Sequence, residues 1–294
     1  MGKYEKKFNI SIIGFGFLGS SLAFGFSNYA NIKIYDKYKD CDSFDETIKH
    51  GDILFFCLPT PFYKDNDGRQ DLNILEGSIS DVHDMVNEKD DKVAVIKSTV
   101  LPGVNKYLQD KYPKLHFVSN PEFLSADSAR IDFLCAARNI LGGESKYVDR
   151  VDDLYKHRFG NSLLTYKTTW EQAELTKYAN NTFFALKLSF FNYIYSVCEK
   201  INCNFDNVRD MIISDSRCGR SHHNVPGADG KRGWGSFCFP KDMMAFMNYS
   251  QDIGVDPGLL KAAWEQNLKD RGSADWENLG PSVVSYKNKK NNKK

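Results

Sequence analysis

The stretch Phe8-Asn-Ile-Ser-Ile-Ile-Gly-Phe-Gly-Phe-Leu-Gly19 decides the fold of this chain. Its first six residues form a short apolar run rich in β-branched side chains, typical of a strand buried on both faces of a parallel sheet. The run opens into Gly14, Gly16 and Gly19, and a helical pattern follows over residues 20–28. A strand, a glycine turn and a helix in this order predict a βαβ unit whose turn can lie close to a pyrophosphate.

Further apolar runs alternate with helical patterns along the first half of the chain. They cover residues 32–35, 53–58, 93–96, 116–118 and 139–141. Strands that alternate with helices indicate an α/β fold, and we expect a Rossmann-type doubly wound parallel sheet over residues 1–166.

The pattern changes near Thr168. Residues 170–200 contain no glycine or proline and carry apolar side chains at helical spacing, which predicts one long helix. Shorter helical segments follow, including 258–269, so we expect a helical domain over residues 167–272. Residues 273–294 show no periodicity and end in lysines and asparagines, which predicts an irregular basic tail.

Composition excludes several classes of protein. The 294 residues are 41% hydrophobic and 26% charged, and 39 Lys+Arg against 38 Asp+Glu give no overall field that attracts nucleic acid or an anionic membrane. The seven cysteines are odd in number and form no C-x-x-C pair, which favours reduced thiols without a metal site. The uncharged stretch 8–32 is interrupted by four glycines, which argues against a membrane span or a leader. We expect a cytoplasmic protein.

The glycine turn carries the predicted dinucleotide site. Gly14 and Gly16 allow close approach of a pyrophosphate, Gly19 lets the helix pack on the strand, and the N–H groups of Phe17 and Leu18 lie at the helix N-terminus. Asp36 ends the next strand, where it can accept hydrogen bonds from the ribose hydroxyls and repel a 2′-phosphate. The expected cofactor is therefore NAD, although Lys37 and Lys39 leave NADP open. The plain alternative is a glycine-rich turn without a ligand.

Five further segments stand in order along the chain. They are Leu58-Pro-Thr-Pro61, Lys97-Ser-Thr99 with Pro102-Gly103, Asn120-Pro-Glu-Phe-Leu124, Ala173-Glu-Leu-Thr-Lys-Tyr-Ala-Asn-Asn181 and Gly233-Trp-Gly-Ser-Phe-Cys-Phe-Pro-Lys-Asp242. Together with the glycine turn they closely resemble the UDP-glucose/GDP-mannose dehydrogenase family, from about residue 8 to about residue 271.

The resemblance implies a four-electron oxidation. In this family the C6 alcohol of a nucleotide sugar, such as UDP-glucose, is oxidised to a carboxylate, and two NAD are consumed. A cysteine holds the intermediate first as a thiohemiacetal and then as a thioester. The implied product is a UDP-glucuronate used in polysaccharide biosynthesis.

By resemblance the nucleophile is Cys238, and the charge of Lys241 could lower its thiol pKa from about 8.5. Without that context, a cysteine among phenylalanines is more often an inert core thiol. Lys177 and Asn181 are four residues apart on the long helix, so both could stabilise an oxyanion at C6. The plain alternative for Lys177 is a surface lysine paired with Glu174 or Glu171.

The resemblance assigns the remaining site residues. Asp242, Glu122 and Thr99 would order the hydrolytic water and accept its proton. Thr60 follows the third strand at the sheet edge where a cofactor lies. The implied contacts are Thr60, Thr99 and Lys241 to the cofactor, and Glu122, Phe123, Leu124, Lys177, Asn181, Arg217 and Gly235 to the substrate. Arg217 would reach the substrate across a homodimer formed through the long helix.

The chain departs from the family pattern in four places. The family's third domain, which completes the nucleotide pocket, does not follow residue 271, so the resemblance is to a short form. A helix and a strand usually inserted after Asp36 are missing. The family's Gly-Gly-Ser before the cysteine reads Gly235-Ser-Phe237, and Ala126 and Asp127 replace a glutamate and a glycine.

Two other functions stay open at this point. One is a two-electron dehydrogenase of the 3-hydroxyacid type, which needs no thiol. The other is a non-catalytic NAD-binding scaffold. His222 and His223 have no role that the resemblance assigns.

Overall fold

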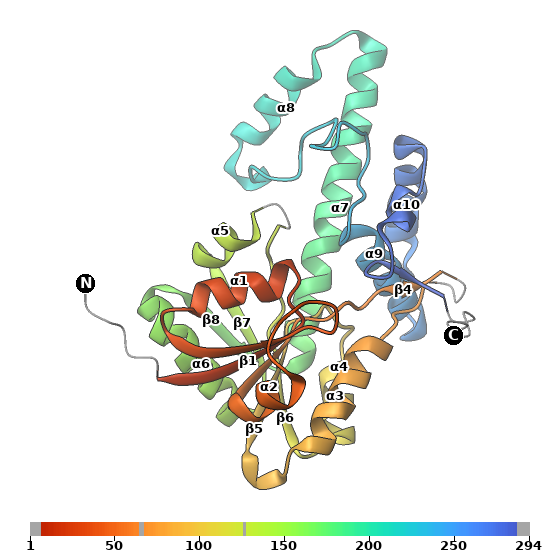
Figure 1. The fold of residues 1–294 in the computed structure, drawn as a ribbon. Helices are drawn as coiled ribbons and strands as arrows, with labels where there is room; N and C mark the ends of the chain where they lie inside the picture. The colour runs from red at the N-terminus through yellow and green to blue at the C-terminus, as the bar shows by residue number, and fades with distance from the viewer. Residues whose placement is uncertain (1–6, 65–67, 126–127, 287–294) are drawn as a thin grey trace. The chain divides into compact units, whose positions relative to one another are not determined.

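The computed structural model describes residues 7–64, 68–125 and 128–286, and the chain forms two compact units (Figure 1). The first unit consists of the residues up to Thr60 together with Leu72–Lys177, and the second of Pro61–Asp71 with the residues from Tyr178 onward. These bounds differ from the predicted 1–166 and 167–272. Residues 61–71 belong to the second unit, and the change of unit falls inside the long helix.

The first unit is built on a seven-stranded sheet with the order β2-β1-β3-β5-β6-β7-β8. Its strands are β1 (Phe8–Ile13), β2 (Ala30–Tyr35), β3 (Ile53–Phe56), β5 (Lys92–Ile96), β6 (Leu115–Ser119), β7 (Arg138–Gly143) and β8 (Leu164–Thr168). The first five of these run parallel, which confirms the doubly wound sheet. The sheet is mostly parallel: β7 pairs antiparallel with β6, and β7 and β8 are parallel to each other.

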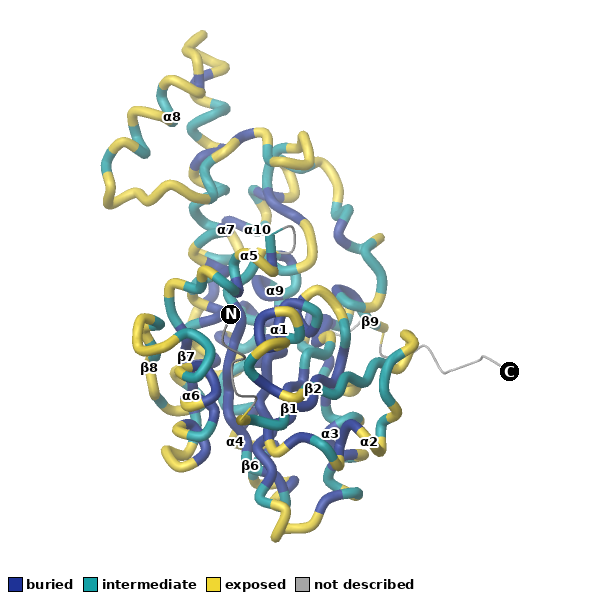
Figure 2. Tube along the Cα trace, turned by 60° about the vertical axis from the view of Figure 1, so that its left-hand side comes forward, coloured by how far each residue is buried: buried dark blue, intermediate teal, exposed yellow. Residues whose placement is uncertain are grey.

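Helices cover both faces of this sheet. They are α1 (Phe17–Phe26), α2 (Phe44–His50), α3 (Asn73–Met85), α4 (Val104–Lys111), α5 (Ala129–Leu134) and α6 (Ser145–Phe159), with the short turns η1 (Glu88–Asp90) and η2 (Gly160–Ser162). Alternate residues of each central strand enter two separate cores: Phe55 packs with α1 and α6, whereas Phe56 packs with α2, α3 and α4. Burial on both faces is why these strands are continuous apolar runs, and they are dark in Figure 2.

The second unit is mainly helical. It contains most of α7 (Trp170–Ile201), then α8 (Phe205–Ser214), η3 (Ser216–Cys218), α9 (Phe239–Asp252), α10 (Gly258–Arg271) and η4 (Asp275–Leu279). Its core holds Trp234 and Met243, with Trp264 of α10 packed against them. The single long helix predicted over 170–200 is confirmed, since α7 covers Trp170–Ile201. None of the described helices combines the length and the hydropathy needed to cross a bilayer.

The prediction of an irregular tail was wrong over its described part, residues 273–286, which is ordered. There, η4 places Trp276 in a core with Phe62 and Val283, with 1% of Trp276 exposed. The strand β9 (Val284–Ser285) pairs with β4 (Phe62–Tyr63). This segment is anchored by a few large buried side chains that are not regularly spaced, so its sequence shows no hydrophobic periodicity. The lysine-rich residues 287–294 lie outside the described part of the chain.

The first turn gives a direct test of the fold. A Cβ atom at Gly19 would lie 2.0 Å from the carbonyl oxygen of Gly14, whereas one at Gly16 would meet no atom within 4 Å. We expect Gly19→Ala to lower the free energy of unfolding by about 1–3 kcal/mol, because backbone on both sides must shift. Gly16→Ala is the matched control and should keep its stability. Urea denaturation measures both, and equal midpoints for the two variants would contradict this packing.

Candidate active site

The glycine turn between β1 and α1 is shaped to accept an anion. Gly14 has φ +94°, and its N–H donates to the Tyr35 carbonyl at 2.8 Å. Gly16 is the N-cap of α1 and makes no side-chain cap, and the first turn of α1 carries no acidic residue. The N–H groups at this terminus, including those of Phe17 and Leu18, therefore keep their positive electrostatic character for a phosphate. The residues fit the predicted pyrophosphate contact.

Asp36 lies beside this turn, immediately after β2. Its carboxylate accepts hydrogen bonds from the backbone N–H of Phe15 at 2.7 Å and of Tyr38 at 2.9 Å. The ammonium of Lys39 donates to the Phe15 carbonyl. A carboxylate oxygen has more than one lone pair, so Asp36 can still accept ribose hydroxyls in this orientation.

Two loops at the carboxyl ends of β3 and β5 are tied together. The Thr60 hydroxyl donates to the Thr99 carbonyl at 2.7 Å, and the Ser98 hydroxyl donates to the Leu58 carbonyl at 2.7 Å. Both threonines are buried. The two segments predicted to border a cofactor are therefore one hydrogen-bonded edge of the sheet, where ligands of open α/β folds bind.

A buried ion pair follows β6 in the first unit. The Lys177 ammonium lies 3.0 Å from Glu122 Oε1, and the Leu124 N–H donates to Oε2 at 2.6 Å. Both side chains are buried, with 7% of Glu122 and 3% of Lys177 exposed. Burial opposes ionisation, but the Lys177 ammonium and the Leu124 N–H outweigh it and lower the pKa of Glu122 below its ordinary value. The same ammonium lies 5.5 Å from the Phe123 ring centroid, so Lys177 is not a solvated surface lysine.

Glu174 has a different role, which the sequence analysis missed. Its carboxylate accepts hydrogen bonds from the N–H groups of Gly103 at 2.7 Å and Asn105 at 2.8 Å, and from the Asn105 amide at 2.8 Å. Gly103 is the N-cap of α4 at φ +96° and has no side chain to cap it. Glu174 therefore caps α4 from another part of the chain. Burial raises the pKa of Glu174 against the effect of these hydrogen bonds. The sequence signal for this contact was that Gly103, before α4, has no side chain to cap the helix.

In the second unit, Asp242 joins two predicted site residues. Asn181 Nδ2 donates to Asp242 Oδ2 at 2.6 Å, and the Lys241 ammonium donates to Asp242 Oδ1 at 2.5 Å. Asp242 is fully buried and Asn181 is buried. The Lys241 charge is thus bound to its neighbouring carboxylate, which already compensates part of the charge that was expected to act on Cys238.

Cys238 is half-buried at the N-cap position of α9. Pro240 stands in the first turn of this helix, and the Asp242 N–H donates to the Cys238 carbonyl at 3.0 Å. The Cys238 thiol therefore stands at the start of a helix, the end at which the helix dipole is positive.

The loop before Cys238 is fixed by α7 and α10. The Gly233 N–H donates to Asn192 Oδ1 at 2.9 Å, and the Trp234 N–H donates to Asn267 Oδ1 at 2.6 Å. A Cβ atom at Gly235 would lie 2.6 Å from the Arg271 guanidinium, so a larger residue would have to displace the end of that side chain. Gly235 serves packing on α10, beyond the substrate contact expected of it.

Arg217 lies on η3 of the second unit. Its side chain is 88% exposed and forms an ion pair with Asp215 two residues away. His222 stacks on Phe184 with ring centroids 4.1 Å apart, so it has a packing role. The departures at Ala126 and Asp127 lie outside the described residues.

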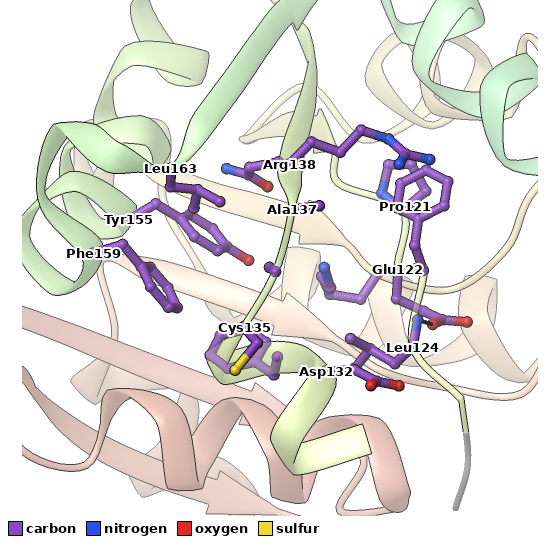
Figure 3. Close-up of a pocket in the computed structure, with 15 residues that line it drawn as sticks. Pro121, Glu122, Leu124, Asp132, Cys135, Ala137, Arg138, Tyr155, Phe159 and Leu163 are labelled. Carbon is purple, nitrogen blue, oxygen red and sulfur yellow. Dashed lines mark hydrogen bonds between the residues drawn. The ribbon is translucent and has the colours of Figure 1, made fainter. Parts of the chain in front are cut away.

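A cavity of about 260 Å³ opens in the first unit beside the ion pair (Figure 3). Its lining includes Glu122 on one side and Tyr155 on the other. Phe123 also lines the cavity, and the Arg138 guanidinium lies 4.5 Å from the Phe123 ring centroid. Lys97 also lines this cavity. The sequence analysis quoted Lys97 as part of a motif but gave it no role.

The described site combines a glycine turn, an aspartate beside it and a buried carboxylate–ammonium pair, an arrangement typical of dinucleotide-binding α/β domains. Residues 31–159 match the NAD-binding domain of the UDP-glucose/GDP-mannose dehydrogenase family, and residues 171–269 match the central domain of that family. The chain belongs to this family, and its first unit is an NAD-binding domain.

One sequence relative and two solved structures show how far the similarity extends. The UDP-glucose 6-dehydrogenase of Rickettsia conorii is 31% identical over 237 residues, which cover 79% of this chain and 52% of the relative. A UDP-glucose dehydrogenase from Pyrobaculum islandicum superposes with a TM-score of 0.79 at 24% identity, over 90% of this chain and 69% of that one. The 3-hydroxyisobutyrate dehydrogenase of Mycobacterium tuberculosis gives a TM-score of 0.71 at 15% identity, over 93% and 99%. The chain spans about half the length of the UDP-glucose 6-dehydrogenases it matches.

The buried ion pair predicts a pH-dependent loss of stability. Glu122→Gln should lower the free energy of unfolding at pH 7 by about 3 kcal/mol, because the Lys177 ammonium keeps its charge without its partner. The folded pKa of Glu122 lies below the ordinary 4.5, so its stabilisation is present above about pH 4.5 and is lost as the pH falls through the folded pKa. Urea denaturation at pH 7 and in acid measures the difference, which should shrink in acid.

The matched control is Glu46→Gln, which removes an exposed carboxylate 3.7 Å from Lys33. An exposed pair contributes less than about 1 kcal/mol. Equal losses for Glu122→Gln and Glu46→Gln at pH 7 would show that burial does not strengthen the Glu122–Lys177 pair.

Proposed function

We propose that this protein is an NAD-dependent nucleotide-sugar 6-dehydrogenase that oxidises UDP-glucose to UDP-glucuronate. The observation that carries the proposal is Cys238 at the start of α9, followed by the buried Asp242–Asn181 hydrogen bond. A thiol in that position is what a four-electron oxidation needs and a two-electron one does not. The match to both family domains supports the same reaction.

The residues divide the chemistry between them. NAD, held by the glycine turn at Gly14 and Gly16 and by Asp36, would supply the hydride acceptor for both oxidations of C6. Cys238 thiolate attacks the C6 aldehyde and forms a carbon–sulfur bond, and the Lys177 ammonium and the Asn181 amide stabilise the resulting oxyanion. The second oxidation leaves a thioester on Cys238.

Hydrolysis completes the reaction. Glu122 takes a proton from the attacking water, which Thr99 helps to orient, and the carbon–sulfur bond breaks to release the carboxylate and the Cys238 thiolate. The lowered pKa of Glu122 keeps it ionised and able to accept that proton at neutral pH. Asp242 holds the Asn181 amide in position and pairs with Lys241. Phe123, Leu124 and Gly235 would border the sugar, and Thr60 and Lys241 the cofactor.

The thiol gives the decisive variant. Cys238→Ser should abolish acid formation, because a serine hydroxyl is not ionised at neutral pH and cannot hold the aldehyde as a thioester precursor. Glu122→Gln should slow turnover by at least about 10²-fold and let a covalent adduct accumulate. Absorbance at 340 nm measures NADH formation, which should reach two per sugar in the wild type. Intact-protein mass spectrometry after mixing with NAD and UDP-glucose detects the covalent adduct.

Cys57→Ser is the matched control. Burial raises the pKa of the Cys57 thiol to about 12, so it stays protonated and its replacement should leave the two-to-one stoichiometry intact. An unmodified mass in Glu122→Gln alongside normal wild-type rates would contradict the thioester route. Oxidation of a 3-hydroxy acid that survives Cys238→Ser would favour the two-electron alternative. NAD binding without turnover of UDP-glucose, UDP-N-acetylmannosamine or GDP-mannose would favour a scaffold.

The outer face of α7 supports a homodimer. Phe183, Phe190 and Tyr193 are 59%, 53% and 60% exposed, and Val197 and Ile201 continue the same face. Their spacing of seven, three, four and four residues forms one apolar stripe, typical of a helix that packs against another helix. A second copy of this chain would bury the stripe and bring the exposed Arg217 within reach of a partner.

The dimer can be tested at the stripe. Tyr193→Glu should convert the protein to a monomer at micromolar concentration, because a buried unpaired carboxylate opposes association. Leu259→Glu on α10, where Leu259 is 71% exposed, makes the same change outside the stripe and should leave the assembly unchanged. Sedimentation velocity measures both. A wild-type monomer, or a dimer that survives Tyr193→Glu, would reject this interface.

A further inference from the structure

Lys97 is a buried lysine that the proposed reaction does not use. It follows β5, is 5% exposed, and its ammonium donates to Asn120 Oδ1 at 3.1 Å. The Tyr155 hydroxyl donates to the same oxygen at 2.8 Å. A lysine in the interior lowers the stability of the fold, because burial penalises its charge.

The Asn120 amide is fixed on its other side as well. Its Nδ2 donates to Asn139 Oδ1 at 2.8 Å and to the Ile140 carbonyl at 2.8 Å. With donors on Oδ1 and acceptors on Nδ2, this amide has one orientation that satisfies all four bonds. Asn120 therefore holds the Lys97 ammonium at a defined point.

That point lies beside Glu122. Lys97 and Glu122 line the same cavity. Burial lowers the pKa of Lys97 to about 8, against the opposing effect of the Glu122 charge. In return Lys97 adds to the effects of Lys177 and the Leu124 N–H that keep the pKa of Glu122 low.

The other titratable or charged groups that face or line this region come from every neighbouring element. They are Cys57 after β3, Asp132 and Cys135 at α5, Arg138 on β7, Tyr155 on α6 and Lys177 on α7. Cys57 and Tyr155 are neutral, since burial raises the pKa of each. Asp132 is bound to the Ser125 N–H and the Ser128 hydroxyl.

We propose that Lys97 is a positioning residue for Glu122: a second, fixed cation that keeps the carboxylate ionised while Lys177 donates to the substrate oxygen. The proposal rests on the proposed function for the role of Lys177. A Lys177 ammonium shared with an oxyanion stabilises Glu122 less than before. Lys97 is held by Asn120 rather than by substrate, so its charge stays in place through the reaction.

The direct test follows the ionisation of Glu122 without turnover. In protein labelled with ¹³C at glutamate side-chain carboxyls, the Glu122 signal is assigned by its absence in Glu122→Gln. Lys97→Met should move the titration of that signal upward by about one pH unit or more, because one of two nearby cations is removed.

Lys92→Met is the matched control. Lys92 lies on the same strand and is also buried, but its ammonium donates to the Gly51 carbonyl at 2.6 Å, and Lys92 is at the opposite end of β5. Its replacement should leave the Glu122 titration in place. If Lys97→Met does not fold, Lys97→Gln replaces it, with Lys97→Arg as the variant that retains the charge.

Kinetics give a second, separate readout. In Lys97→Met the acid limb of the plot of kcat/KM against pH should move upward by the same amount. At pH values below the acid limbs of both proteins, kcat/KM of the variant should be about tenfold lower than that of the wild type. Lys97→Arg should restore the wild-type plot. A Glu122 titration that does not move in Lys97→Met or Lys97→Gln overturns the proposal, even if the variant is less stable. A titration that moves in a protein that oxidises none of the sugars tested would support the Lys97 role and reject the proposed function.

Discussion

The ion pair between Lys177 and Glu122 is the interaction on which the candidate site depends. Two charges in the interior are favourable only if each lies close to its partner and if the remaining hydrogen-bond donors and acceptors of both groups are satisfied. Here the ammonium lies 3.0 Å from the carboxylate, and the backbone N–H of Leu124 occupies the second oxygen. This requirement fixes the loop after β6 relative to the first turns of α7, both within the first unit. A group that the proposed reaction needs in its charged form thus also stabilises the fold.

The same electrostatic reasoning separates cysteines that look alike in the sequence. Cys57 follows β3 at the cofactor edge, but burial raises its pKa to about 12, and it remains a thiol. Cys238 is half-buried and stands where α9 begins, at the positive end of a helix. The chemical difference comes from the surroundings of each sulfur, which a count of cysteines does not contain. The flanking Phe-Pro-Lys-Asp was informative because proline marks a helix start.

The parts predicted correctly from the sequence are those whose cause is local. The strand β1 was predicted at its observed bounds because both its faces are buried, and Asp36 lies beside the glycine turn because a parallel crossover places it there. The strand β8 was missed because it lies at the sheet edge and its residues are partly exposed, so it has no apolar run. The Glu174 cap and the Asn120 network join residues from 19 to 71 positions apart. Such long-range contacts are set by the tertiary fold, and no spacing rule reveals them.

Lys92 and Lys97 show how far position alone decides the use of a residue. Both are buried lysines of the same segment, and burial lowers the pKa of each. Lys92 meets a backbone carbonyl at the end of the sheet opposite the ligand edge, where no reacting group is expected. Lys97 meets an amide that is itself held by three further hydrogen bonds, and it lines the same cavity as the carboxylate that the proposed reaction needs ionised. A buried ammonium that only filled space would be replaceable by methionine, so the fixed amide beside Lys97 is the feature that distinguishes a positioned charge from an incidental one.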